Sequence, residues 1–423
     1  MNTGKSYMKN GFGKAVNKNN IIFTPETPCY LGSLTKQFTV TAIMILYEKH
    51  KLSLNDPLSK YFPEFPLYAH GVTIRHLLNH TSGIPDYVDL GLEHPGLTDK
   101  EVLKALIQQD TLQFFPGEKF AYSNSGYILL GMIIEKVSGQ TYADFLKKNI
   151  FIPLHMNNTF VYEKSSQREN IAHGYGRFGN DSDYDLLTYG EGGIYSSVTD
   201  MFKWDQALYT NKIISQLIIK EVFTPGRLND GSITSSGFDW GIGNYDNLTT
   251  YSHAGRYGGF NTYIKRFPKD RNTIIFLTNN DFKNMSLPGN ALINILYDKP
   301  YSSPKLSIAE EMNRIYKSDG IDTAIQKYET MQKSKDTTYD YSESELNEFG
   351  YYLLGLNKTE DAIKILKLNA EAFPSSWNVY DGLGEAYMKH LDKELAIRNY
   401  QKSLELNPEN LNATSMLQKL RKQ

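Results

Sequence analysis

Hydrophobic and polar residues follow two different patterns along the chain, and the pattern changes near residue 300. Up to about residue 298, short strand-like runs are mixed with helical runs, whereas from residue 307 onward only helical spacing remains. Residues 297–304 read Tyr-Asp-Lys-Pro-Tyr-Ser-Ser-Pro, and prolines separated by serines interrupt any continuing element. The pattern therefore predicts a mixed α/β domain over residues 1–298, a Pro/Ser linker over 299–306 and an all-helical domain over 307–423.

The C-terminal part repeats itself with a period of 34 residues. The repeated positions are Gly350 and Gly384, Ala362 and Ala396, and Pro374 and Pro408. Small residues where two helices cross, with proline after the second helix, are typical of tetratricopeptide repeats. Residues 309–332 read as a third, degenerate helix pair, and residues 409–421 read as an amphipathic capping helix. Two interpretations stay open: these helices only cover the first domain, or they form a concave surface for a protein partner.

Composition and charge suit a globular protein with real cores. The chain has 423 residues, and its 45 Lys and Arg against 47 Asp and Glu give a formal net charge of −2. This balance argues against nucleic acid as a partner and against a polybasic membrane module. No apolar run approaches the roughly 18 residues that a membrane span needs. The one cysteine, Cys29, excludes an intramolecular disulfide and a metal site built from cysteines.

Ser33 and Lys36 are the first candidates for chemistry. They precede the run from Phe38 to Tyr47, whose apolar residues have helical spacing. Ser33 is therefore expected at the start of a helix, with Lys36 one turn on and on the same face. A serine hydroxyl becomes a good nucleophile when a nearby base takes its proton, and a desolvated lysine amine can be that base. The same spacing occurs twice elsewhere in polar contexts, so Ser33 could instead be a simple helix cap.

Two further groups of residues favour a catalytic role for Ser33 over a simple helix cap. Tyr122-Ser123-Asn124 follows a turn and precedes a helix-like segment, and His253-Ala254-Gly255 opens a glycine-rich turn before strand-like residues. Each pattern alone also occurs elsewhere in the chain. All three groups in this order, with wide separations and a fitting structural setting for each, are a much more specific signal.

With these motifs, the first domain resembles the serine β-lactamase and penicillin-recognising enzyme superfamily, above all its class C branch, which includes esterases and DD-peptidases. The matching motifs are Ser33-x-x-Lys36, Tyr122-x-Asn124 and His253-x-Gly255. Flanking segments are similar as well, namely residues 24–27, 54–58, 76–85, 172–175 and 192–196. The resemblance covers nearly all of residues 4–280.

The resemblance implies an α+β fold, in which an antiparallel sheet is flanked by helices and accompanied by a helical subdomain. Strands around residues 5–30 and 237–280 are expected to form one antiparallel sheet, with the mostly helical residues 60–185 beside it. Ser33 is then expected in the cleft between the sheet and the helical region. An all-α repeat domain follows.

The resemblance also implies a role for each motif residue. Ser33 is the acylated nucleophile, and Lys36 and Tyr122 share the general-base and general-acid work. The N–H groups of Ser33 and Arg256 are expected to form the oxyanion hole. The positions that bind or orient the substrate are Asn124, His253, Gly255 and Arg256.

The histidine of the third motif bears on the substrate, because many relatives carry lysine there. A lysine is a permanent cation that can hold a substrate carboxylate, whereas histidine is mostly neutral above pH ~6.5. This argues against a dedicated β-lactamase. One hypothesis is that Arg256 or protonated His253 binds a substrate carboxylate; the alternative for Arg256 is a solvated loop arginine.

Several other residues are assigned structural roles. His76 and His80 have metal-ligand spacing but no third ligand, so no metal site is expected. Cys29 is expected to be a small buried hydrophobic residue rather than a reactive thiol. Glu191 precedes Gly192 and Gly193 in a loop that in the family lies close to the active site, and it is expected to be a solvent-facing loop carboxylate.

The leading function is therefore a serine hydrolase that forms an acyl-enzyme on Ser33 with ester, amide or β-lactam substrates and needs no cofactor. One alternative is a DD-carboxypeptidase or endopeptidase acting on peptidoglycan stems. The other is a non-catalytic sensor or scaffold whose helical repeats bind a protein. The motif residues Ser33, Lys36, Tyr122 and His253 are all present, and this favours catalysis over the last alternative.

Relatives normally carry a helix and a strand ahead of the segment that matches Gly4–Gly13. The resemblance therefore predicts that this chain begins too late and lacks an interior strand. The first residues also lack the basic and apolar regions of a leader peptide. Localisation stays open: the family is usually periplasmic or secreted, whereas a genuine start at Met1 predicts a cytoplasmic protein.

Overall fold

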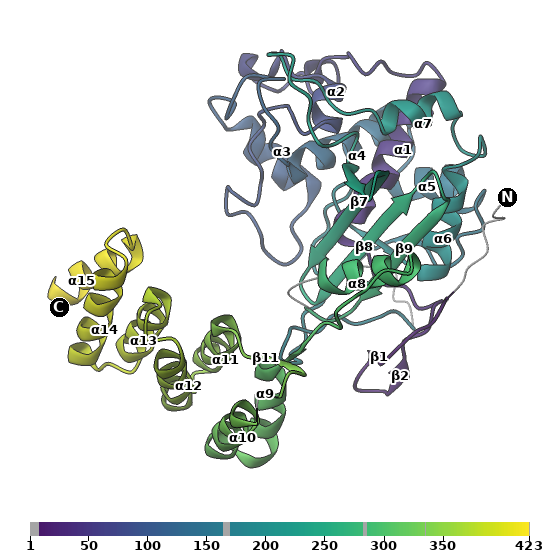
Figure 1. Ribbon diagram of the computed structural model, residues 1–423. Helices are drawn as coiled ribbons and strands as arrows, with labels where there is room; N and C mark the ends of the chain where they lie inside the picture. Colours follow the sequence, from purple (N-terminus) through teal and green to yellow (C-terminus); the bar gives the residue numbers. More distant parts are fainter. Residues whose placement is uncertain (1–7, 164–169, 282–285, 335, 423) are drawn as a thin grey trace. The chain divides into compact units, whose positions relative to one another are not determined.

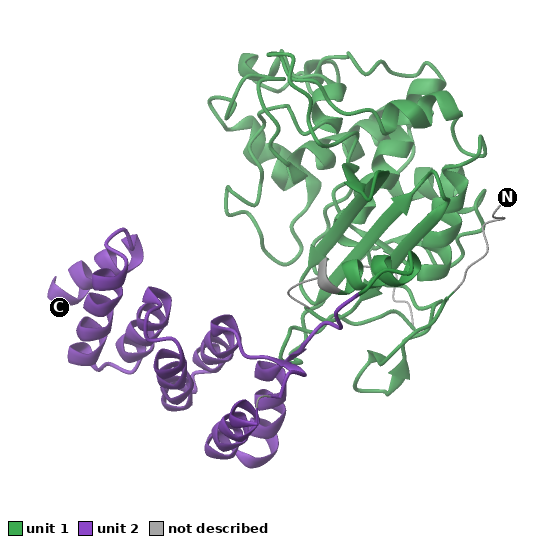
Figure 2. Cartoon of the chain, in the orientation of Figure 1, with its two compact units in different colours: residues 1–300 green, residues 301–423 purple. Residues whose placement is uncertain are grey.

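The computed structural model describes residues 8–163, 170–281, 286–334 and 336–422, and Figure 1 shows its helices and strands. The chain divides into two compact units, residues 1–300 and 301–423 (Figure 2). The first unit is a β-lactamase/transpeptidase-like α+β fold with antiparallel sheets, and the second is all-helical apart from two short strands.

The largest sheet of the first unit has four antiparallel strands in sequential order. They are β6 Gly241–Tyr245, β7 Leu248–Tyr257, β8 Phe260–Phe267 and β9 Asn272–Thr278. The turn between β6 and β7 consists of Asp246 and Asn247, both with positive φ, as a two-residue type I′ hairpin requires. Short hairpins of this kind keep the sheet order the same as the chain order.

Both faces of this sheet are covered. Phe267 and Ile274 face the helix α8, Ser286–Leu296, and form a small core with its Ile293. Phe260 and Ile264 face the other way, into the main core around α1, Thr35–Glu48, and α6, Val198–Ala207. In Figure 1, α8 and α1 accordingly lie on opposite sides of the strands. The alternation of residues along β8 therefore separates the two layers.

The expected single sheet that joins residues 5–30 to residues 237–280 is wrong. The N-terminal strands form two other sheets: β1 Lys14–Val16 pairs with β2 Ile21–Ile22, and β3 Cys29–Tyr30 joins β5 Ile194–Ser196 and β4 Phe160–Val161. The amide of Asn279 donates at 3.1 Å to the carbonyls of Lys14 and Ala15, so a side chain rather than a backbone ladder connects β1 to the end of β9. Residues 5–7 of the predicted strand region lie outside the described residues.

The predicted helical region lies between β3 and β5. Its helices are α2 Ile74–Leu78, α3 Asp99–Ile107, α4 Asn124–Ser138 and α5 Tyr142–Leu146, and α7 Gln216–Val222 follows β5 and α6. Short helical turns are η1 Gly32–Leu34, η2 Leu58–Lys60, η3 Leu67–Ala69 and the π-helical η4 Lys147–Phe151. Polar side chains fix where these helices start: Thr98 caps α3, and Ser123 caps α4 by accepting the N–H of Gly126.

The second unit consists of paired helices. They are α9 Ile308–Asp319, α10 Ile321–Lys333, α11 Glu343–Gly355, α12 Thr359–Ala372, α13 Trp377–Lys389, α14 Lys393–Leu406 and α15 Leu411–Lys422, with the short parallel strands β10 Leu306–Ser307 and β11 Tyr339–Asp340. A Cβ atom on Gly350 would lie 2.6 Å from the Leu366 side chain, and one on Gly384 would lie 3.0 Å from Tyr400. The repeated glycines are therefore needed where two helices cross. None of the helices in the described ranges has both the length and the apolarity to span a membrane.

Candidate active site

Two glycines bring the backbone of η1 against that of β7. Gly32 has a φ of +55°, and a Cβ atom there would lie 2.7 Å from the amide nitrogen of Arg256. A Cβ atom on Gly255 would lie 3.0 Å from the amide nitrogen of Ser33 and 2.0 Å from the carbonyl oxygen of Leu31. Only glycine fits at these positions, and the N–H groups of Ser33 and Arg256 consequently lie close together.

The N–H of Arg256 points out of the hydrogen-bond ladder of the sheet. β7 pairs with β6 only as far as Ser252, so residues 253–257 have β8 on one side and η1 on the other. The two-residue loop 258–259 joins β7 to β8, and the residues that flank such a loop bond to each other. Arg256, the next residue back, therefore directs its N–H toward η1 and Ser33. An oxyanion hole requires two donors converging in this way.

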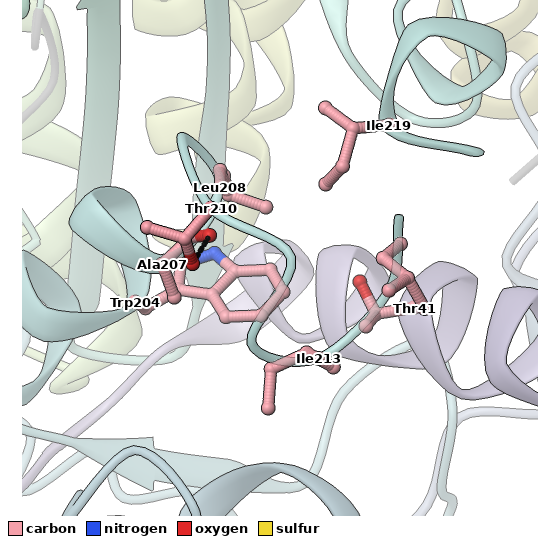
Figure 3. A pocket seen from close by; sticks show the side chains of 8 residues that line it. Thr41, Trp204, Ala207, Leu208, Thr210, Ile213 and Ile219 are labelled. Atoms are coloured by element: carbon pink, nitrogen blue, oxygen red, sulfur yellow. Dashed lines mark hydrogen bonds between the residues drawn. The ribbon is translucent and has the colours of Figure 1, made fainter. Parts of the chain in front are cut away.

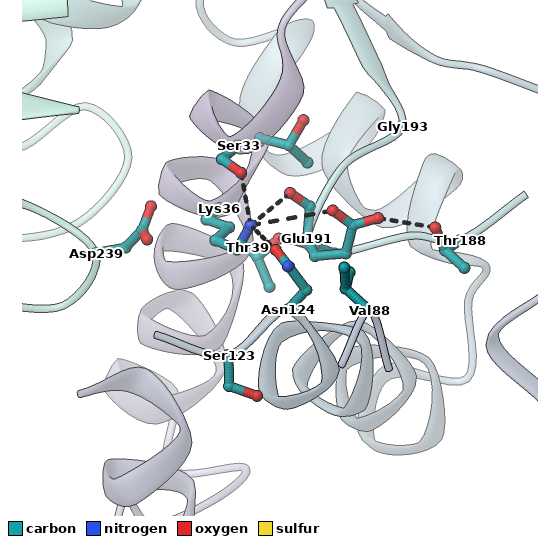
Figure 4. Close-up of polar contacts among 12 residues, drawn as sticks. Ser33, Lys36, Thr39, Val88, Ser123, Asn124, Thr188, Glu191, Gly193 and Asp239 are labelled. Atoms are coloured by element: carbon teal, nitrogen blue, oxygen red, sulfur yellow. Dashed lines mark hydrogen bonds and ion pairs between the residues drawn. The ribbon is translucent and has the colours of Figure 1, made fainter. Parts of the chain in front are cut away.

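Lys36 lies at the centre of the candidate site (Figure 4). Its Nζ is 2.9 Å from Ser33 Oγ, 2.9 Å from Asn124 Oδ1 and 3.0 Å from the carbonyl oxygen of Glu191. The last two oxygens can only accept, so they hold two of the amine hydrogens. When Lys36 is neutral, its lone pair therefore faces the hydroxyl of Ser33. Burial lowers the pKa of Lys36, and the nearby carboxylates, Glu191 foremost, oppose this.

Tyr122 lies against both Lys36 and His80. Lys36 Nζ is 4.9 Å from the centroid of the Tyr122 ring, and the ring stacks on His80 with centroids 4.4 Å apart. Burial raises the pKa of Tyr122 well above 10, the charge of Asp239 adds to this, and a hydrogen bond with Ser33 opposes it. Solvent still reaches 42% of the residue, which limits the size of the shift but not its direction. The phenol therefore keeps its proton at neutral pH.

Asn124 is held in place by the loop before α4. Its backbone N–H donates to Asp86 Oδ2 in a short hydrogen bond, and the N–H of Tyr87 donates to Ser125 Oγ at 2.8 Å. These bonds attach residues 86–87 to the first turn of α4. The side chain of Asn124 is thereby directed toward Lys36.

His80 supports the ring of Tyr122 from within the core, where it is 1% exposed. Its Nδ1 accepts the N–H of Ser123 at 3.0 Å. The neutral ring therefore carries its hydrogen on Nε2, which lies 3.3 Å from Asp239 Oδ1 and donates to it. Burial lowers the pKa of His80, and Asp239 opposes this. The sequence analysis assigned His80 a structural role, but its contacts with Tyr122 and Asp239 were missed.

Asp239 lies between His80 and His253. The Nε2 of His253 is 3.1 Å from the same Asp239 Oδ1, and its Nδ1 is 2.7 Å from the carbonyl oxygen of Ala254. Carboxylate and carbonyl oxygens both accept, so both nitrogens of a charged His253 donate within the protein and neither is left for a ligand. Burial would raise the pKa of Asp239, but His253, His80 and Lys36 outweigh burial and hold it below the ordinary 3.8.

The β-lactamase family model matches residues 1–298. The chain belongs to the β-lactamase family. A penicillin-binding protein of Bacillus subtilis strain 168 is 36% identical over 320 residues, which are 70% of this chain and 69% of that protein.

Solved structures agree with this family assignment. The octameric penicillin-binding protein homologue from Pyrococcus abyssi is 29% identical with a TM-score of 0.64, and the match covers 74% of this chain and 75% of that one. D-amino acid amidase from Ochrobactrum anthropi SV3 is 26% identical with a TM-score of 0.58, and the match covers 68% of this chain and 90% of that one. The serine β-lactamase/transpeptidase superfamily predicted from the sequence is therefore confirmed.

In this family domain, the side chain of Arg256 does not lie with Ser33 in the candidate site. Arg256 pairs across the sheet with Asn261, so it lies on the face opposite His253 and Gly255, which pair with Ile264 and Thr262. Its guanidinium is 61% exposed and bonds to Asp281 at 2.8 Å. The structure brings the backbone N–H of Arg256 to the site and directs its cation elsewhere.

The expected solvent-facing carboxylate at Glu191 is wrong, because this residue is only 7% exposed. Its Oε1 accepts the hydroxyl hydrogen of Thr188 at 2.8 Å, and its Oε2 is 4.0 Å from Lys36 Nζ. Neighbouring glycines let the loop fold inward: a Cβ atom on Gly190 would lie 2.3 Å from the carbonyl oxygen of Tyr127. The available sequence signal was the resemblance, which places this loop close to the active site.

The remaining candidates have structural positions. His76 closes a capping box with Thr73 at the start of α2, and Cys29 is buried in β3, where burial raises the pKa of its thiol. The described part of the chain contains no cluster of His, Cys, Asp or Glu suited to a metal ion. A small apolar pocket between α1 and α6 (Figure 3) shares no residue with the Ser33 cluster. It is lined by Thr41, Trp204, Ala207, Leu208, Thr210, Ile213, Ile214 and Ile219.

Proposed function

We propose that this protein is a serine acyl hydrolase in which Ser33 forms the acyl-enzyme. The observation that carries the proposal is the placement of Lys36, whose Nζ lies 2.9 Å from Ser33 Oγ while two acceptors hold its other hydrogens. A neutral amine held in this way presents its lone pair to the serine hydroxyl. Membership of the β-lactamase family supports the same reaction class.

The reaction begins when Lys36 Nζ takes the proton of Ser33 and Oγ bonds to the acyl carbon. The electron pair of the carbonyl group moves onto its oxygen, which faces the N–H groups of Ser33 and Arg256. Loss of one such donor typically costs about 3 kcal/mol of transition-state stabilisation. Collapse of the intermediate breaks the bond to the leaving group, which takes the phenol proton of Tyr122. Lys36 then returns its proton to Tyr122.

Deacylation follows the same path in reverse. A water molecule takes the place of the leaving group, gives one proton to the Tyr122 and Lys36 pair, and adds to the acyl carbon. Collapse of this second intermediate breaks the bond to Ser33 Oγ, which recovers a proton from Lys36. Because both residues return to their starting states, no external acid, base or cofactor is consumed.

The wall opposite Ser33 favours esters and amides with an uncharged leaving group. A charged His253 has both nitrogens engaged by Asp239 and Ala254, and Arg256 is paired with Asp281 on the other face. Neither cation is free to bind a terminal carboxylate. The similarity to a D-amino acid amidase supports this substrate class. The similarity to a penicillin-binding protein supports the second candidate, a peptidase acting on peptidoglycan stems.

Intact-mass labelling tests the proposal. A fluorophosphonate and a penicillin are each incubated with wild type, with Ser33→Ala and with Ser302→Ala, whose serine has the same spacing to a lysine outside the site. We expect the fluorophosphonate adduct on wild type and Ser302→Ala and none on Ser33→Ala. An unlabelled wild type would refute the proposal. A penicillin adduct that persists for hours would favour the peptidase.

Two esters then separate the substrate classes. Methyl 3-acetoxybenzoate and 3-acetoxybenzoate differ only by a carboxylate on the leaving group. Because neither His253 nor Arg256 is free, we expect the neutral ester to react faster. A preference for the anionic ester would contradict the assignment of an uncharged leaving group without affecting the labelling of Ser33.

A further inference from the structure

The loop before β5 places a second ionisable group against the base. The side chain of Glu191 is buried, and its Oε2 lies 4.0 Å from Lys36 Nζ, which itself has no exposed surface (Figure 4). The backbone carbonyl of Glu191 also accepts a hydrogen bond from Nζ at 3.0 Å. One residue therefore contacts Lys36 through both its main chain and its charge.

The orientation of this carboxylate is fixed from the far side. Thr188 Oγ1 donates to Glu191 Oε1 at 2.8 Å, and Thr188 is itself fully buried. The hydroxyl of Tyr30 lies 2.4 Å from where a Cβ atom on Gly192 would be, so the loop directly after Glu191 is packed closely against Tyr30. A buried carboxylate held by one hydroxyl and one ammonium is not a surface charge that happens to lie nearby.

Other charges face Lys36 as well, and they are held differently. Asp239 is bonded to His80 and His253, and Asp86 accepts backbone N–H groups at the start of α4 and in its own loop. The rings of Tyr122 and Tyr127 cover the amine at 4.9 and 5.7 Å. Among the three carboxylates, Glu191 is the one that forms an ion pair with Lys36 in the described structure.

The groups around Glu191 leave Lys36 as its cationic partner. Burial foremost, together with the charges of Asp86 and Glu93, raises the pKa of Glu191, whereas Lys36 and the Thr188 hydroxyl oppose this rise and favour the ionised carboxylate. The hydroxyls of Tyr30, Tyr87 and Tyr184 also lie in its field, and each has its pKa raised by burial and by the Glu191 charge. These phenols stay neutral, so among these groups only Lys36 can balance the charge of Glu191, and it does so when it is protonated.

We infer that Glu191 is a positioning residue that stabilises the ammonium formed when Lys36 takes the proton of Ser33. This inference rests on the proposed function. During attack, positive charge develops on an amine that water does not reach, which is costly without a fixed counter-charge. A preorganised carboxylate at 4.0 Å provides that counter-charge without reorganisation. At the site Glu191 contacts Lys36, through its carbonyl oxygen and its carboxylate, so we assign its effect to Lys36.

A stabilising role for the pair in folding is the weaker explanation. Buried ion pairs add little net stability, because the loss of hydration offsets their attraction. Gly190, Gly192 and Gly193 also raise the entropic cost of folding, because glycine gives the unfolded chain conformational freedom that folding removes. Bringing a carboxylate inside at this cost is consistent with use in the reaction.

Glu191→Gln tests the inference, because glutamine keeps the size of the side chain and its bond from Thr188 while removing the charge. We expect kcat on a neutral ester to fall by about 10- to 100-fold, less than the roughly 100- to 1000-fold typical for loss of a donor that contacts the reacting atoms directly. Removing the anion also lowers the pKa of Lys36 further, so the acid limb of the pH–rate profile moves to lower pH. Glu48→Gln, at the other end of α1, is the matched control and should leave both unchanged.

A direct titration separates this inference from the proposed function. Protein labelled with ¹³C at the lysine ε-carbons reports the protonation of Lys36 by NMR, and Lys36→Arg identifies its signal. The midpoint should be lower in Glu191→Gln than in wild type, whether or not Ser33 reacts with a fluorophosphonate. Thr188→Val is the second variant: it removes the hydrogen bond that favours the charged carboxylate and should shift the midpoint in the same direction by less.

Two results would overturn the inference. One is an unchanged midpoint or a rise in Glu191→Gln. The other is a loss of kcat with an acid limb that stays in place, which would indicate a purely structural residue. Glu191→Asp keeps the charge and should keep the acid limb near that of wild type even where its rate is lower.

Discussion

Replacing Asp239 with alanine tests whether this carboxylate positions Tyr122 through His80. The change leaves His80 Nε2–H, now 3.3 Å from Asp239 Oδ1, without an acceptor in a residue that is 1% exposed. An unsatisfied buried donor costs about 1–3 kcal/mol. His80 can avoid that cost by tilting, but its stacking on Tyr122, at 4.4 Å between centroids, then changes. Since 1.36 kcal/mol is tenfold in rate, we expect kcat to fall by about 10- to 100-fold.

Asparagine at the same position separates geometry from charge. Asp239 has a φ of +58°, a conformation that asparagine tolerates, and the asparagine oxygen can still accept from His80. Asp239→Asn should therefore retain more activity than Asp239→Ala. Both substitutions remove the carboxylate charge that lies 3.1 Å from His253 Nε2, so any altered preference between neutral and anionic esters should appear in both variants.

The pH dependence of folding stability tests the environment of the Asp239 carboxylate independently of activity. The pKa of Asp239 is lowered in the folded protein from 3.8, so its contribution is present above the unfolded value and is lost as the pH falls through the folded value. Wild type should be more stable than Asp239→Asn at neutral pH, and the difference should shrink below about pH 4. Urea unfolding at several pH values measures this difference.

Asp246→Asn is the matched control, because Asp246 also has a positive φ of 50° and lies in the turn between β6 and β7, away from Ser33. It should leave both kcat and the ester preference unchanged. Full activity in Asp239→Ala, measured on folded protein, would refute the reasoning that links Asp239 to Tyr122. A stability difference that grows toward low pH would refute the conclusion that folding lowers the pKa of Asp239.

Two further changes have definite outcomes. Gly32→Ala places a Cβ atom 2.7 Å from the Arg256 nitrogen at a φ of +55°, so it should cost at least about 1 kcal/mol in urea unfolding and slow the labelling of Ser33 by a fluorophosphonate. Asp205→Asn breaks the buried pair with Arg266, whose Nε lies 2.5 Å from Asp205 Oδ1. It should destabilise the first unit by about 3–5 kcal/mol in urea unfolding, with the labelling rate of the folded protein unchanged.

The parts of the fold that were predictable are those with local or repeated signals. The helix after Ser33 follows from apolar spacing between Phe38 and Tyr47, and the structure has α1 over Thr35–Glu48. The 34-residue repeat places Gly350 at a helix crossing that has no room for a Cβ atom. Strands of two or three residues, such as β1 and β2, carry too little alternation to specify a partner, and the prediction of one sheet was wrong for them.

The predicted motif residues converge in space, but the residues that support them had no comparable signal. Asp239 lies 159 positions from His80, and a single acidic residue between two aromatic ones has no periodicity to interpret. Glu191 was misread because a charged residue in a glycine-rich loop is usually exposed. Burial of a charge depends on partners contributed by other elements, in this case Lys36 from α1, and sequence spacing does not reveal such partners.

The opposing effects on Lys36 explain how a fully buried lysine can serve as a base. Burial alone favours the neutral amine, which is ready to accept a proton but resists carrying the resulting charge. Carboxylates alone would keep Lys36 permanently protonated, and its nitrogen would then have no lone pair with which to accept the serine proton. Glu191, Asp239 and Asp86 are each held by different partners on different elements, so they restore part of the charge stability without contacting Ser33. An amine balanced in this way can both take the serine proton and pass it on to Tyr122, as the proposed acyl-enzyme cycle requires.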